Sequence, residues 1–221
     1  LILLSVISIL GCDQEDSIEN SHGTRLVAIE YIEDDRSWFE NYKYTLDGKL
    51  DIVEDFYSLG RRYELQYEND RLIEYKTYSI DDNKLIFRDS IQYNSEGQIQ
   101  NIYNFSINSG QDLPLTWIYE FEYDNQNRVS KKSTYSVNDE EYTSIEKFYW
   151  SGNNIERAEY YNGEEELYYE YFYTYDDKIN YKKGVPILIS NPINWCDNNV
   201  LQTNYKDHVG NLDLICGPCT S

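Results

Sequence analysis

Several residue types are scarce in this chain, and each scarcity excludes a class of protein. The 221 residues include four Pro, two His and no Met, and only 19 Lys plus Arg stand against 40 Asp plus Glu. The formal charge of −21 disfavours nucleic acid, whose binding requires cations that replace counterions. It also disfavours electrostatic docking on anionic lipid. We therefore expect no nucleic-acid partner.

Residues with the spacing of a catalytic or cofactor-binding motif are lacking as well. The chain has no Gly-rich phosphate loop and no EF-hand loop. Neither His22 nor His208 has a candidate nucleophile nearby in the sequence. Carboxylates are so abundant that no pair of them is informative. We therefore predict a protein that is not an enzyme, with no catalytic residues, no cofactor and no metal.

The apolar content is mostly aromatic and alternates with charge. Tyr alone supplies 24 residues, and Tyr favours strands and half-wet surfaces. In the segment 117–123, four aromatic residues fall on one face of a strand, and Glu120 and Glu122 fall on the other. No segment of the chain has a convincing helical period. The alternation predicts an all-β protein, an antiparallel sheet with one buried face.

This strand pattern repeats along the chain. Six times an aromatic residue is followed by turn-forming residues and then by an aliphatic residue. The six pairs are Tyr44–Leu50, Tyr67–Leu72, Tyr93–Ile99, Tyr123–Val129, Tyr149–Ile155 and Tyr173–Ile179. The aliphatic members lie 22 to 30 residues apart, which is typical of repeat architectures. We predict an antiparallel meander of repeated β-hairpins with about 12–14 strands, either barrel-like or a strongly curled single sheet.

The first residues are typical of an export signal. Residues 1–11 are apolar or small, and this run is too short to span a bilayer as a helix. It ends in Ile9-Leu10-Gly11-Cys12, which resembles a bacterial lipobox. The resemblance implies a partial signal peptide and lipid attachment at Cys12. Because residue 1 is not Met, we expect further residues before it. Residues 12–24 are polar and acidic and are predicted to form a flexible tether.

The C-terminal segment, residues 184–221, contains three more cysteines, and three chemistries are open for them. The tetrapeptide Cys216-Gly217-Pro218-Cys219 is identical to the thioredoxin active-site sequence, but no βαβ unit precedes it. Together with Cys196 and His208, the two cysteines have the residue types of a zinc site. An oxidising, exported location favours disulfides instead. We predict a structural disulfide among Cys196, Cys216 and Cys219.

The repeat resembles a known sequence motif. The stretch "FEYDNQNRV" at residues 121–129 is similar to the tyrosine–aspartate repeat of Rhs-type proteins. The matching residues are Tyr123, Asp124, Arg128 and Val129, with Asn127 where that repeat has Gly. Together with the lipobox, the acidic tether and a later Asn-Pro loop, it makes the chain similar to small Bacteroidetes lipoproteins of unknown function. Some of these are described as having a porin-like β fold.

This resemblance implies a fold and a cellular location, and it implies no catalytic residues. It implies a β-hairpin repeat domain over residues 25–183 and a membrane partner bound through the lipid on Cys12. We predict a non-catalytic lipoprotein of the outer membrane, on the cell surface, with a periplasm-facing location as the alternative. Its role would be binding or envelope structure. A glycan-binding or glycan-processing surface lipoprotein and an envelope assembly or secretion factor are the two alternatives, with a glycan or an envelope protein as partner.

Overall fold

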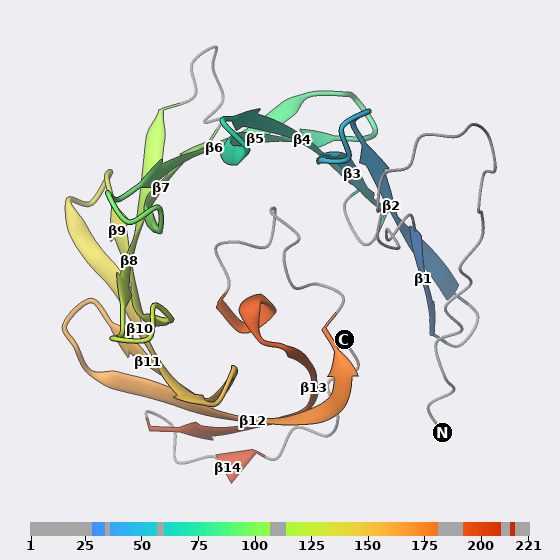
Figure 1. The fold of residues 1–221 in the computed structure, drawn as a ribbon. Coiled ribbons are helices and arrows are strands. Elements are labelled where there is room, and N and C mark those ends of the chain that lie inside the picture. The colour runs from blue at the N-terminus through green and yellow to red at the C-terminus, as the bar shows by residue number, and fades with distance from the viewer. Residues whose placement is uncertain are drawn as a thin grey trace. The chain divides into compact units, whose positions relative to one another are not determined.

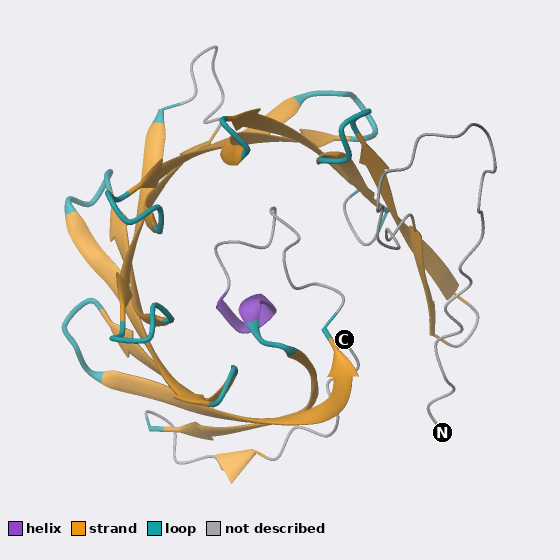
Figure 2. Ribbon diagram, in the orientation of Figure 1, coloured by secondary structure: helices purple, strands orange, loops and turns teal. Residues whose placement is uncertain are grey.

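The computed structural model describes residues 28–33, 36–56, 60–106, 114–180, 192–208 and 213–214. These residues form β-strands, turns and one short 3-10 helix, η2 (Pro192–Trp195) (Figure 2). None of the helical residues described is part of a helix long and apolar enough to cross a membrane. The predicted signal peptide, the tether and both predicted domain boundaries lie outside the described residues and stay predictions.

All described strands are antiparallel neighbours, and their order in the sheet is their order along the chain. The strands are β1 (Ala28–Glu33), β2 (Arg36–Tyr44), β3 (Leu50–Asp55), β4 (Arg61–Glu68), β5 (Arg71–Ser79), β6 (Leu85–Tyr93), β7 (Ile99–Ser106), β8 (Leu115–Tyr123), β9 (Val129–Ser136), β10 (Glu141–Ser151), β11 (Asn154–Asn162), β12 (Leu167–Ile179), β13 (Asn198–Asp207) and β14 (Asp213–Leu214). The predicted all-β meander is confirmed. Because β1 and β14 end this order, the described strands make an open sheet.

The chain divides into two compact units, residues 1–66 with 75–86 and residues 67–74 with 87–221. In the first unit, β2 and β3 pair with a register shift between Lys43 and Tyr44, and Val53 on β3 is 1% exposed. In the second unit, β7 to β13 curve around η2 (Figure 1). β13 pairs with β12 along most of its length, so the C-terminal segment contributes a strand to the sheet of this unit.

Four hairpin turns share one hydrogen-bond pattern. They begin at Thr45, Asn94, Asp124 and Asn162. In each, the backbone N–H of the first residue donates to the carbonyl four positions on, and the N–H three positions on donates back. The residue three positions on has a positive φ in every one: Gly48 (89°), Gly97 (81°), Asn127 (62°) and Glu165 (63°). Asn127 can replace the Gly of the Rhs-type repeat because Asn tolerates this left-handed conformation.

The exposed Glu165 is the least suited of these four residues to its backbone conformation. We expect Glu165→Gly to raise the free energy of unfolding by about 1 kcal/mol, because a left-handed non-Gly residue is strained and Gly is not. The greater entropy of Gly in the unfolded chain offsets part of the gain. Urea denaturation measures the change. Gly97→Ala is the opposite control, since its Cβ would lie 2.7 Å from the Arg71 guanidinium; a lower stability for Glu165→Gly would contradict the argument.

The aliphatic residues of the repeat are buried anchors that bind the following repeat through their backbone. Their carbonyl oxygens accept hydrogen bonds of 2.7–2.9 Å from an aromatic side chain 20 to 24 residues later. The donor–acceptor pairs are Tyr93–Leu72, Tyr123–Ile99, Trp150–Val129 and Tyr175–Ile155. Each bond satisfies the polar tip of a half-buried ring. These hydrogen bonds therefore connect each hairpin to the next, and we call the series the ladder.

The sixth predicted pair, Tyr173–Ile179, is wrong because both residues lie on β12 and no turn separates them. In the last two copies the aromatic residue of the ladder also differs from the one in the sequence pair. A β-bulge between Tyr149 and Trp150 places Trp150, and not Tyr149, in the ladder. In the last copy the ladder residue is Tyr175 in place of Tyr173. The predicted anchor of that copy, Ile179, is 86% exposed, and it ends β12 after a register shift that follows Tyr175.

Basic residues of the repeat also reach forward to the next hairpin. The guanidinium of Arg128 donates to the carbonyl of Gly152 at 2.7 Å and lies 5.5 Å from the ring centre of Trp150. Arg71 lies in the same way over the ring of Tyr93, at 5.4 Å. Such cation–π contacts contribute about 0.5–1 kcal/mol each at exposed sites. They explain why a basic residue precedes the aliphatic anchor in these copies.

Candidate functional site

The two faces of the second unit differ in chemistry. We call inner the face on which η2 packs, where the rings of Phe121 and Trp195 stack with centroids 6.2 Å apart. The opposite, outer face carries the carboxylates of β8. Glu120 accepts a hydrogen bond from the hydroxyl of Tyr142 at 2.8 Å, and Glu122 pairs with Lys131. The alternation predicted for residues 117–123 thus separates rings from charges.

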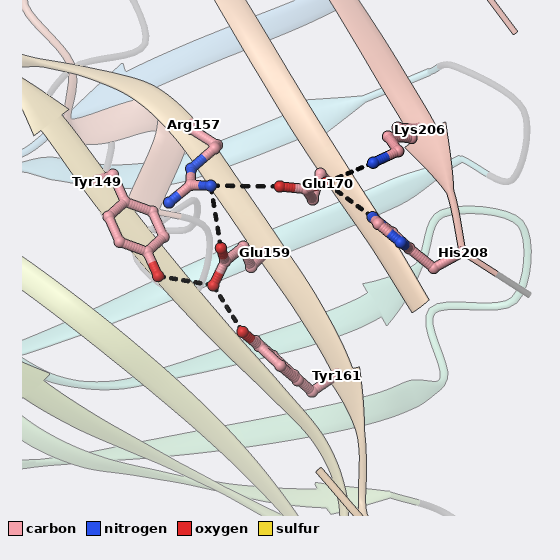
Figure 3. Close-up of polar contacts among 7 residues, drawn as sticks. All are labelled: Tyr149, Arg157, Glu159, Tyr161, Glu170, Lys206 and His208. Atoms are coloured by element: carbon pink, nitrogen blue, oxygen red, sulfur yellow. Dashed lines mark hydrogen bonds and ion pairs between the residues drawn. The ribbon is translucent and has the colours of Figure 1, made fainter. Parts of the chain in front are cut away.

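A cluster of polar residues joins four strands on the outer face (Figure 3). Its members are Tyr149 on β10, Arg157, Glu159 and Tyr161 on β11, Glu170 on β12, Lys206 on β13 and His208 just after β13. Glu159 lies at its centre and is 8% exposed. One carboxylate oxygen of Glu159 accepts 2.6 Å hydrogen bonds from both tyrosine hydroxyls. The other lies 3.2 Å from the Arg157 guanidinium.

The second carboxylate of the cluster, Glu170, is equally surrounded by donors. Its Oε1 lies 3.2 Å from Nη1 of Arg157, and its Oε2 lies 2.7 Å from Nε2 of His208 and 3.6 Å from Nζ of Lys206. Glu159 and Glu170 are directly opposed across β11 and β12. Like charges in that position destabilise a sheet. The guanidinium of Arg157, which contacts both carboxylates, offsets this repulsion.

These contacts shift the pKa values of the cluster in consistent directions. The hydrogen bond to Glu159 raises the pKa of Tyr149 and raises that of Tyr161 to about 12. Burial of Glu170 raises its pKa, but the hydrogen bond from His208 and the charges of Lys206, His208 and Arg157 outweigh it, so the pKa is lowered. The raised pKa values keep both tyrosines protonated, and the lowered pKa keeps Glu170 ionised, so their hydrogen bonds stay intact at neutral pH.

The arrangement is that of an interstrand clamp. All four carboxylate oxygens of Glu159 and Glu170 have a donor or cation within 3.2 Å. Acid–base catalysis by a carboxyl pair requires one protonated group and one available base. Carboxylates saturated by fixed donors fit neither role. The chemistry of this cluster therefore favours joining β10, β11, β12 and β13 over catalysis.

The clamp predicts an acid-sensitive contribution to stability. Because the folded pKa of Glu170 is lowered, its contribution is fully present above its ordinary pKa of 4.5 and is lost as pH falls through the lowered value. We expect Glu170→Gln to destabilise at pH 7 and to differ much less from the unmodified chain near pH 3. Urea midpoints at the two pH values test this, with Glu164→Gln at an exposed turn as a control for net charge. An equal loss at both pH values would contradict it.

The structure describes one of the four predicted cysteine sites. Cys12, Cys216 and Cys219 lie outside the described residues, so lipid attachment and the disulfide stay predictions. Cys196 is fully buried, with Sγ 3.3 Å from the backbone N of Ile155 and 3.4 Å from the hydroxyl of Tyr175. Within the described part of the chain, no group of three or more His, Cys, Asp and Glu has the geometry to hold a metal ion.

The sequence did not predict the clamp: Tyr149 was assigned to the repeat, His208 was considered as a zinc ligand, and the other members were not singled out. The only signal was the alternation of Arg157, Glu159 and Tyr161 along one strand, which puts them on one face. Their partners on neighbouring strands follow from the sheet register, which the sequence does not state.

Comparison with known proteins supports the fold. No family model and no curated protein matches the sequence. A solved porin-like protein from Bacteroides uniformis is 11% identical with a TM-score of 0.51, over 81% of this chain and 77% of that one. A porin-like protein from Bacteroides vulgatus is 10% identical with a TM-score of 0.46, over 83% and 81%. The TcdB2–TccC3–Cdc42 structure is 16% identical with a TM-score of 0.39, over 65% of this chain, which spans 8% of that one.

These likenesses differ in what they establish. At 11% identity, the Bacteroides uniformis protein shows a similar fold and nothing about activity. The TM-scores of the other two are too low to extend that conclusion. The predicted porin-like β fold therefore agrees with a solved structure, and the activity and location of the chain are argued below as proposals.

Proposed function

We propose that this chain is a lipid-anchored protein of the outer membrane, displayed on the cell surface, with a binding or envelope-structural role and no catalytic activity. The observation that carries the structural, non-catalytic part of the proposal is the outer-face clamp, whose carboxylate oxygens all have a donor or cation within the cluster. Because this surface holds neighbouring strands together, it favours a structural role for the sheet. The lipobox ending in Cys12 and the acidic tether support the anchor.

The anchor is tested with Cys12→Ser in the native host. We expect the unmodified chain to incorporate labelled palmitate and to sediment with the outer membrane. Cys12→Ser should lose the label and move to the soluble fraction. Cys219→Ser is the matched control and should keep both properties. Proteinase K added to intact cells separates the surface location from the periplasm-facing alternative. A wild-type chain that is soluble and carries no label would refute the anchor.

Glycan binding is the second candidate function, and a specific observation favours it. Tyrosine rings cluster on the inner face of the second unit, at Tyr160, Tyr169, Tyr171, Tyr173 and Tyr205. Aromatic rings of this kind are common in binding surfaces because they offer rigid contact area and a polar tip. A role in envelope assembly or secretion stays a third prediction, which a pull-down from envelope extracts would test.

A further inference from the structure

A continuous row of polar side chains crosses the inner face of the second unit. The ammonium of Lys132 on β9 lies 2.6 Å from a carboxylate oxygen of Glu146 on β10. Tyr160 on β11 lies beside Glu146 on the same face, and burial together with that neighbouring carboxylate raises the pKa of Tyr160. Lys132, Glu146 and Tyr160 are directly opposed in the sheet register. The row spans three strands, β9 to β11, which is about 10 Å at the usual strand spacing.

If the only role of the inner face were packing, this polar row would be energetically unfavourable compared with apolar residues. The side chains of Lys132 and Glu146 are 13% and 11% exposed. A buried ion pair loses its hydration and regains little, so apolar residues of similar volume usually do as well or better. Packing alone therefore does not account for an ammonium, a carboxylate and a phenol in one line. Groups of this kind are expected where a polar ligand is recognised.

Aromatic rings flank the polar row at both ends. The ring of Tyr171 lies 5.0 Å from that of Tyr160, 6.3 Å from that of Tyr173 and 5.9 Å from that of Tyr205, the last two stacked. The rings of Tyr171, Tyr173 and Tyr205 are only half-buried. At the other end, the ring of Tyr119 lies 5.5 Å from the ammonium of Lys132.

We propose that this inner face, built on Lys132, Glu146, Tyr160, Tyr171, Tyr173 and Tyr205, binds a neutral oligosaccharide. Sugar rings present apolar C–H faces that stack on aromatic rings, and hydroxyls that both donate and accept hydrogen bonds. The row offers donors and acceptors in alternation. The ion pair has no net charge, and the chain carries −21, so an anionic polysaccharide would be repelled. The row length fits several sugar units better than one.

This inference rests on the second candidate function and gives it a site. The test uses the full chain in mild detergent, titrated with neutral hexasaccharides from glucans, mannans, galactans and xylans while Trp fluorescence and heat are recorded. We expect saturable binding to at least one neutral series and none to uronic-acid or sulfated oligosaccharides. The double variant Lys132→Met with Glu146→Leu should bind at least tenfold more weakly, which corresponds to 1.4 kcal/mol or more.

Two controls separate loss of the site from loss of the fold. The double variant removes both charges together, so it is expected to stay folded, and circular dichroism checks this. Tyr142→Phe removes a hydroxyl on the outer face and should leave affinity unchanged. Absence of binding to every neutral series, preference for an anionic series, or full affinity in the double variant would each overturn the proposal. None of these results depends on the membrane fractionation of Cys12→Ser, so the two proposals fail separately.

Discussion

Replacing Ile155 with alanine is expected to lower the free energy of unfolding by about 3–4 kcal/mol, whereas Ile179→Ala should change it by less than about 0.5 kcal/mol. Ile155 is fully buried, and its carbonyl accepts the 2.7 Å hydrogen bond from Tyr175. Its truncation leaves a cavity under the ladder that connects successive hairpins. Ile179 is 86% exposed, so its truncation removes little contact.

The comparison is informative because both residues occupy the same position of the sequence repeat. Urea denaturation of the two variants, with equal slopes of unfolding free energy against urea concentration, gives the difference directly. A loss of this size is a large part of the stability of a typical domain. Equal effects for the two variants would show that the last copy of the repeat is packed like the others, against the exposure of Ile179.

This pair also shows what the sequence can and cannot predict about the fold. The recurrence of an aromatic residue, a turn and an aliphatic residue was sufficient for the all-β meander and for five of the six anchors. It does not decide which ring enters the ladder where two aromatic residues are adjacent. Tyr149 and Trp150 both fit the pattern, and only the bulge between them decides which ring enters the ladder. Bulges depend on tertiary pairing and leave little trace in local sequence.

The candidate site was less predictable than the fold for a related reason. The clamp depends on Glu159 facing Glu170 across two strands, and a shift of one residue would turn every member to the other face. With 40 acidic residues in the chain, no single Glu is marked out. The inner row is hidden in the same way, because Lys131 and Lys132 are adjacent and the sequence does not say which one is buried.

A second large effect is expected at that inner row. Glu146→Leu alone should lower the free energy of unfolding by about 3–5 kcal/mol, because it leaves the buried ammonium of Lys132 without its counter-ion. Lys132→Met alone should also lower the free energy of unfolding, because it leaves the buried carboxylate of Glu146 without its counter-ion. The double variant should recover to within about 1 kcal/mol of the unmodified chain, since a pair of apolar residues needs no counter-ion. The coupling between the two positions would then be at least about 3 kcal/mol.

The outer pair of Lys131 and Glu122 provides the matched control for this cycle. Its N–O distance is 2.8 Å, close to the 2.6 Å of the inner pair, but its side chains are 31% and 65% exposed. Lys131→Met, Glu122→Leu and their combination should give a coupling below about 1 kcal/mol, reduced further by salt. The lysines are adjacent and both pairs are in contact, so the pairs differ in burial and in the ring of Tyr119 beside Lys132. A small coupling at both pairs would mean that water reaches the inner row, and the packing argument for a ligand site there would lose its energetic basis.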